Sequence, residues 1–169
     1  MGQEEETIVS MPVNLSKVVP ASQIRGEDEQ ETIELREMLE DASHYVKSFN
    51  WCRGIDEAYM GIGIGGVVGV FLFKIHPAGP EVDSWIWTVV GDLPPAYIAV
   101  EDAPNPAAAL DAYIGAMQEW VEAAKTGRSV DGLIPVNVAP TPDYASQLES
   151  RLEFLDKNIL SDYSDDLRE

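Results

Sequence analysis

Residues 60–100 form the stretch that most constrains the fold of this chain. They hold most of its strongly β-forming, uncharged residues, in the run MGIGIGGVVGVFLFKIHPAGPEVDSWIWTVVGDLPPAYIAV. Short runs of β-branched and aromatic residues bounded by glycine and proline are typical of strands. The stretch therefore predicts a sheet, and the segments on either side must bury their apolar faces against it.

A Gly65-Gly66 pair separates two apolar runs within this stretch. Both central residues of a two-residue type I′ turn need φ > 0, so the pair predicts a hairpin. The cross-strand pairs that such a turn predicts are Ile64 with Val67, Ile62 with Gly69 and Met60 with Phe71. We expect one side of the hairpin to be core, and it would carry Met60, Ile62, Ile64, Val67 and Phe71.

Two further strands are expected after the Pro77-Ala78-Gly79-Pro80 break. The first spans about 84–90 and ends at the 91–95 segment, because proline cannot donate to the ladder. Alternation along it places Trp85, Trp87 and Val89 on one face and Ile86, Thr88 and Val90 on the other. A short strand at 96–100 follows.

Helical spacing of apolar residues predicts three helices. The first covers 31–49. The second starts after Asn105, which fits the N-cap position before Pro106, and stops at Gly127. The third follows Thr141-Pro142 by the same capping logic and runs to about 159. Between the last two helices, 129–140 is either an edge strand or an extended segment over the core.

These elements predict an α+β fold. It is a small, mainly antiparallel meander of three or four strands, with one helix before it and two helices after it packed on one face. We expect residues 1–30 to be an acidic, partly disordered arm, 31–160 to be a single domain, and 161–169 to be an acidic tail. Apolar residues of the arm, within 8–19, could pack along the domain or on a second copy in a homodimer.

The formal net charge is −19, from 11 basic and 30 acidic residues. Such a balance argues against nucleic acid and anionic membrane as partners and favours a basic protein. The plainer interpretation is that the acidity only keeps the protein soluble. The longest uncharged run, 58–73, falls short of the ~18 residues of a membrane-spanning helix. With no secretory signal and one cysteine, we expect a cytoplasmic protein.

Several motifs of catalytic, cofactor-binding or metal sites are either absent or stand in the wrong structural context. Residues 61–66 match G-x-G-x-x-G, but no helix is expected to open at the last glycine, so the hairpin is favoured over a dinucleotide site. Cys52 with His44 or His76 lacks any spacing that marks a thiol nucleophile and its base. We find no metal-ligand spacing, no phosphate-binding loop and no G-x-S-x-G elbow. The sequence thus indicates no catalytic residues, metal or cofactor, and it leaves enzymatic activity open.

Four residues form a candidate ligand site. Trp85 and Trp87 share a strand face, and Asp92 and Tyr97 lie just beyond the strand, so one hypothesis is an aromatic-lined pocket with one carboxylate. Arg53 or His76 could supply a further charged group. The competing interpretation is core packing of Trp87 against the second helix, which aromatic residues at strand spacing favour.

The segment WTVVGDLPPAY, residues 87–97, is followed by an Asp-x-Pro loop and a helix bearing Trp120. It resembles the W-x-V-x-G-D-L-P-x-x-Y core of small bacterial domains of unknown function, a likeness that covers about 51–155. The resemblance implies a small bacterial cytoplasmic protein and brings no catalytic residues with it.

The charge and the missing catalytic set favour a non-catalytic protein-binding or regulatory module. Its partner would be basic, such as a toxin or nuclease that an immunity or inhibitor protein neutralises. The alternative is a small-molecule-binding protein or enzyme that uses the pocket near Trp85, Trp87, Asp92 and Tyr97.

Overall fold

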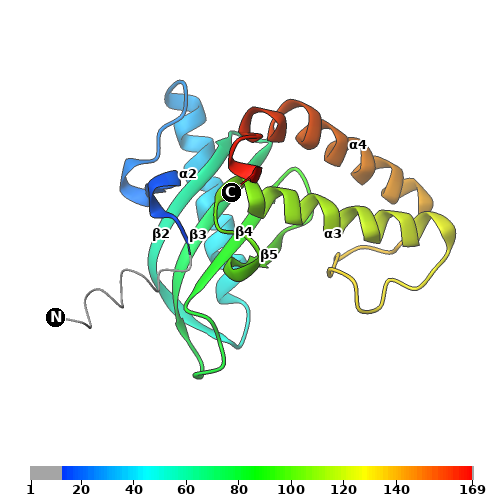
Figure 1. Ribbon diagram of the computed structural model, residues 1–169, viewed down its shortest axis with the longest axis horizontal. Coiled ribbons are helices and arrows are strands. Elements are labelled where there is room, and N and C mark those ends of the chain that lie inside the picture. The colour runs from blue at the N-terminus through cyan, green and yellow to red at the C-terminus, as the bar shows by residue number, and fades with distance from the viewer. Residues whose placement is uncertain (1–12, 169) are drawn as a thin grey trace.

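The computed structural model describes residues 13–168 as an antiparallel sheet with helices on both faces (Figure 1). The strands are β1 (Val19–Pro20), β2 (Cys52–Ile64), β3 (Val68–Pro77), β4 (Trp85–Gly91) and β5 (Ala96–Ala99). They lie side by side in chain order. The α+β class and the antiparallel meander are therefore confirmed, but the sheet has five strands where three or four were expected.

The additional strand is β1, which comes from the segment expected to be an arm. Val19 pairs with Met60 and Pro20 with Tyr59 on the outer edge of β2. Two residues ending in proline give no strand signal of their own, because proline removes a donor and is tolerated only at a sheet edge. The pairing arises from β2, which offers an open edge there.

The β2–β3 hairpin does not use a type I′ turn. Only Gly66 of the glycine pair has positive φ, at 74°, and the Val67 amide donates to the Ile64 carbonyl at 2.9 Å. Positive φ at the third residue alone is typical of a type II turn. The loop is then three residues long. The pairs found are Ile64 with Val68, Gly63 with Gly69, Ile62 with Val70 and Met60 with Phe71.

Two of the three expected pairs are therefore wrong, and the third is right because β2 contains an irregularity. A register shift between Met60 and Ile62 restores the partner of Met60. It also sends the two side chains to opposite faces of the sheet: Ile62 lies in the core with α3 (Pro106–Thr126), whereas Met60 packs on the side of α2 (Glu29–Lys47). The expected single core face of this hairpin is thus divided between two cores.

The sheet separates these two cores. The core on the α3 side takes Val68, Val70, Leu72, Trp87 and Val89 from β3 and β4. The core on the α2 side takes Phe71, Phe73, Ile75, Ile86 and Val90. The alternation expected along β4 is confirmed. Because both faces are covered, the central strands β3 and β4 are nearly continuous runs of buried residues.

Helices α3 and α4 begin where the sequence predicts their caps, whereas α2 begins at Glu29, two residues before the expected start, after an Asp28 cap that was not predicted. The Asp28 carboxylate accepts from the Glu31 amide at 2.8 Å, the Asn105 side chain from the Ala108 amide at 2.9 Å, and the Thr141 hydroxyl from the Tyr144 amide at 3.2 Å. Helix α3 ends at Gly127, whose φ of 73° is left-handed. Helix α4 spans Pro142–Asn158 and packs on α3, so the two later helices share one face and α2 covers the other (Figure 1).

The segment 129–140 between α3 and α4 contains no strand, so the edge-strand interpretation is wrong. Ile134 and Val136 instead pack against the core on the α3 side. The remaining elements are 3-10 helices: η1 (Leu15–Lys17), η2 (Ala21–Gln23), η3 (Val100–Asp102), η4 (Leu160–Tyr163) and η5 (Asp166–Arg168).

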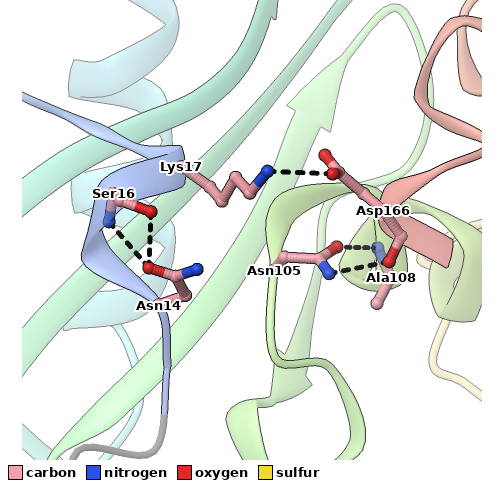
Figure 2. Close-up of polar contacts among 6 residues, drawn as sticks. All are labelled: Asn14, Ser16, Lys17, Asn105, Ala108 and Asp166. Carbon is pink, nitrogen blue, oxygen red and sulfur yellow. Dashed lines mark hydrogen bonds and ion pairs between the residues drawn. The ribbon is translucent and has the colours of Figure 1, made fainter. Parts of the chain in front are cut away.

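Residues near both ends of the described chain meet beside the start of α3 (Figure 2). Lys17 forms an ion pair with Asp166 at 3.0 Å, and the Asn105 amide group donates to the Asp166 carbonyl at 3.0 Å. Val13 is buried in the core on the α3 side, and the backbone N–H of Asn14 donates to the Pro104 carbonyl. The part of the expected arm at 1–12 lies outside the described residues.

Candidate functional site

Trp87, the centre of the candidate aromatic site, is a core residue. Its side chain is fully buried on the α3 side of the sheet, and its indole N–H donates to the Ala103 carbonyl at 2.8 Å. A buried tryptophan needs such an acceptor for its single donor. Trp87 therefore anchors the chain between β5 and α3 and presents no surface to a ligand.

The other three candidate residues lie in different places. Trp85 is half-buried on the same face as Trp87, with Lys74 Nζ 5.9 Å from its ring. Tyr97 pairs with Thr88 and so lies on the opposite, α2 side of the sheet. Asp92 follows the far end of β4 from Trp85. The structure brings Trp85 and Trp87 onto one face and separates both from Tyr97 and Asp92.

Arg53 and His76, suggested as further charged groups, are exposed and lie near the end of the sheet where β2 begins and β3 finishes. Cys52 is buried, and its thiol donates to the Gly54 carbonyl at 3.4 Å. The G-x-G-x-x-G match at 61–66 runs from β2 into the hairpin turn, and β3 follows it. No helix opens there, as expected for a hairpin.

Clefts lie instead beside the 91–95 loop. One cleft of about 550 Å³, here the loop–α4 cleft, lies between this loop, the hairpin turn and α4, and its lining includes Asp92, Leu93, Arg151 and Phe154. A second of about 470 Å³, the loop–α2 cleft, lies on the other side of the same loop. The residues lining the loop–α2 cleft include Met38, Asp41, Tyr45, Val90, Asp92, Leu93 and Pro95. Both volumes fall within the range of about 300–1,000 Å³ typical of ligand sites.

The 91–95 loop is fixed by hydrogen bonds on both sides. Gly91 has φ 144°, and a Cβ at this position would lie 2.2 Å from the Val67 carbonyl oxygen. The Asp92 amide donates to that same oxygen at 3.1 Å. On the other side the buried Tyr113 hydroxyl donates to the Pro94 carbonyl at 2.6 Å. The glycine is required because only it allows this close approach of loop and turn.

Asp92 and Arg151 are in direct contact and both line the loop–α4 cleft. Their ion pair measures 3.2 Å, with 71% of the aspartate side chain and 43% of the arginine side chain exposed. Exposed pairs of this kind contribute at most about 1 kcal/mol. Either partner can therefore exchange this contact for one with a bound group at little cost.

A cluster of four aromatic rings joins the end of α2 to β5, and we call it the aromatic cluster: Tyr45, Phe49, Trp51 and Tyr97. Phe49 and Trp51 stack with ring centroids 5.0 Å apart, and Tyr97 meets both rings edge-on at 5.2 and 5.1 Å. Tyr97 is 39% exposed, and the other three rings are partly exposed. The cluster therefore forms an aromatic surface.

Two tyrosines around the 91–95 loop are held in the neutral form. Burial, with a smaller contribution from Tyr97, raises the pKa of Tyr45 to about 12. Burial also raises the pKa of Tyr113 well above its ordinary value. Both hydroxyls thus remain hydrogen-bond donors throughout the physiological range, and neither is suited to act as a base.

Helix α2 carries six carboxylates that form no ion pair with any other residue in the range 13–168: Glu29, Glu31, Glu34, Glu37, Glu40 and Asp41. The ion pairs between described residues use acidic side chains of other elements. Glu31 is occupied locally, because its carboxylate accepts from the Gly65 and Glu27 amides. The outer surface of α2 is therefore a source of uncompensated negative charge.

No family model, curated protein or solved structure matches this chain. Within residues 13–168, no group of three or more His, Cys, Asp or Glu side chains is arranged to hold a metal ion. No helix in the same range combines the length and apolarity needed to cross a bilayer.

Sequence reasoning did not single out the aromatic cluster or the loop–α2 cleft. Tyr45 and Phe49 stand four residues apart, and Trp51 follows, which is a weak local signal of an aromatic surface at the end of a helix. Tyr97 joins them only because β5 lies beside the 48–51 segment, which follows α2, in the folded chain. Contacts between segments so far apart leave no trace in local spacing.

Proposed function

We propose that this protein is a non-catalytic binding or regulatory module that recognises a basic protein partner. The observation that carries the proposal is the set of α2 carboxylates that form no ion pair within the described part of a chain whose net charge is −19. A bacterial cytoplasmic immunity or inhibitor protein is the kind of module that this chemistry suits. Its partner would be a toxin or nuclease whose basic, substrate-binding surface the module covers.

The arrangement of charge on α2 supports recognition in addition to solubility. Ile33 is 47% exposed on the outer surface of α2, and Glu29 and Glu37 stand four residues before and after it. Residues four apart on a helix are neighbours on one face, so an apolar contact point lies between two carboxylates. Such charges steer a basic partner towards the surface, and an apolar residue there adds contact area once it has docked.

Charge reversal on α2 tests the proposal. Glu29, Glu37 and Glu40 are exposed, and changing all three to lysine should remove a basic partner that co-purifies with the wild-type protein at low salt. The matched control changes Asp111, Glu119 and Asp156, which are exposed on α3 and α4, to lysine. Equal binding by the two variants, or no partner with the wild type, would count against the proposal.

A second candidate function is supported by the loop–α4 cleft. Its volume of about 550 Å³ and the exposed ion pair of Asp92 and Arg151 suit a small anionic molecule. Such a molecule would replace Asp92 as the ion-pair partner of the Arg151 guanidinium. In this second proposal the small molecule binds beside Asp92, away from Trp85, Trp87 and Tyr97. A metabolite panel in which no compound raises the melting temperature of the wild type more than that of Arg151→Ala would argue against it.

A further inference from the structure

We propose that an arginine-bearing segment of the basic partner docks along one groove, made of the loop–α2 cleft and the aromatic cluster. One arginine enters the cleft beside Asp41 and Asp92, and a neighbouring arginine stacks on Trp51 and Tyr97. This inference rests on the proposed function, because it names where and by which groups a basic protein is held.

The cleft and the cluster are continuous through Tyr45. This residue lines the loop–α2 cleft, and its ring lies edge-on to Phe49 with centroids 5.1 Å apart. On the opposite wall, Pro95 lines the cleft two residues before Tyr97 of the cluster. A single extended segment can therefore contact the cleft and the rings together.

The chemistry of the cleft suits the stem and the charge of an arginine. Met38, Val90, Leu93 and Pro95 supply apolar lining, and Asp41 and Asp92 are its charged residues. Long basic side chains lay their methylene stems on apolar surface and keep the charged end beside carboxylates. Among residues 13–168, no lysine or arginine lines this cleft.

The flanks of the cleft are negative as well. Glu34 lies beside Gly66 of the hairpin turn, with Oε2 3.9 Å from where a Cβ on that glycine would be. Lys47 follows Tyr45 by two residues, and at about 100° of helical turn per residue it points to the other side of α2. The exposed ion pair between Asp92 and Arg151 is weak enough for Asp92 to accept a second guanidinium.

The exposed rings favour arginine over lysine. Trp51 and Tyr97 meet at a centroid distance of 5.1 Å and an interplanar angle of 65°, which leaves their faces at different tilts on one surface. A planar guanidinium stacks on such faces, and tryptophan and tyrosine are enriched at the residues that dominate interface energies. The groove thus offers ion pairing at one end and stacking at the other.

The test uses the octapeptide (Arg-Gly)4 as probe and amide and indole chemical shifts of the isotope-labelled full chain as readout. We expect peptide-dependent shifts at Trp51, Tyr97 and Asp41. The lysine analogue (Lys-Gly)4 should bind more weakly, and (Glu-Gly)4 should cause no shifts. Asp41→Lys should weaken (Arg-Gly)4 binding about tenfold, the scale of an important interface residue, and Tyr97→Ala should remove the shift at the Trp51 indole.

The control is Asp111→Lys, which makes the same change of charge on an exposed residue of α3. Because Asp41 and Asp111 are both exposed, neither substitution should alter folding, which thermal melting of each variant checks. If (Arg-Gly)4 binds Asp41→Lys and Asp111→Lys with equal affinity, or shifts appear away from the groove, the groove is not the docking site, although a basic partner is still recognised. If the wild type binds neither basic peptide, the groove and the proposed function both fail.

Discussion

Replacing Tyr113 with phenylalanine removes the bond that holds the 91–95 loop on α3. The Tyr113 side chain is fully buried, and its hydroxyl donates to the Pro94 carbonyl at 2.6 Å. Phenylalanine keeps the ring and its packing but leaves that carbonyl without its donor. An unmade buried hydrogen bond costs about 1–3 kcal/mol, so we expect the free energy of unfolding to fall by about 2 kcal/mol.

Chemical denaturation and thermal melting measure this change. For a domain of this size, about 2 kcal/mol corresponds to a melting temperature lower by about 4–8 °C. Tyr144→Phe is the matched control, because Tyr144 is only half-buried and packs edge-on against Trp120 with centroids 5.9 Å apart. We expect the control to change stability by less than about 0.5 kcal/mol. Equal effects of the two variants would refute the idea that this hydrogen bond anchors the loop.

Three further predictions concern stability. Gly91→Ala should lower the free energy of unfolding by about 3 kcal/mol or more, because the φ of Gly91 is 144° and a Cβ there would meet the Val67 carbonyl. In the same urea titration, the control Gly115→Ala in α3 should raise the free energy of unfolding by about 0.5–1 kcal/mol. Thr88→Val should stabilise the protein by about 1 kcal/mol in urea, since the buried Thr88 hydroxyl oxygen has no hydrogen-bond partner among the described residues; destabilisation would reveal an unseen partner. The raised pKa values of Tyr45 and Tyr113 mean that stability should be full below pH 10 and should fall as the pH rises from 10 towards 12, with a shallower fall in Tyr113→Phe; a flat melting temperature across this range would contradict the assignment.

Features encoded by a few neighbouring residues could be predicted from the sequence. Asn105 before Pro106 and Thr141 before Pro142 supply side-chain acceptors to amides three residues on, so both helix starts were found. The alternation along β4 was also predicted correctly, because successive side chains of a strand point to opposite faces of the sheet. These predictions need no knowledge of what lies across the sheet.

Features that depend on distant segments could not be predicted. The glycine pair at 65–66 is compatible with more than one turn, and the three-residue loop that formed changed two of the three expected pairs. The register shift between Met60 and Ile62 then placed the Ile62 side chain on the α3 face. The regular alternation of a strand does not predict such an irregularity. Strand β1 exists only because β2 offers it an edge.

The arrangement of the candidate ligand site could not be predicted from local sequence either. Trp85, Trp87, Asp92 and Tyr97 are close in sequence, but a strand and the turn after it send them to two faces and to opposite ends of β4. Tyr97 instead lies with Phe49, which is distant in sequence and follows the end of α2. Proximity along the chain was a poor guide because a sheet distributes neighbouring residues over both of its faces.

The most direct test of the account is the mass of the complex isolated from the native host at low salt, measured by native mass spectrometry and a sizing column. We predict a stoichiometric complex with one basic protein, which dissociates at high salt because exposed charges are then screened. A chain that runs alone, or only with copies of itself, at low salt would contradict the central claim that its acidic surface serves to bind a basic partner.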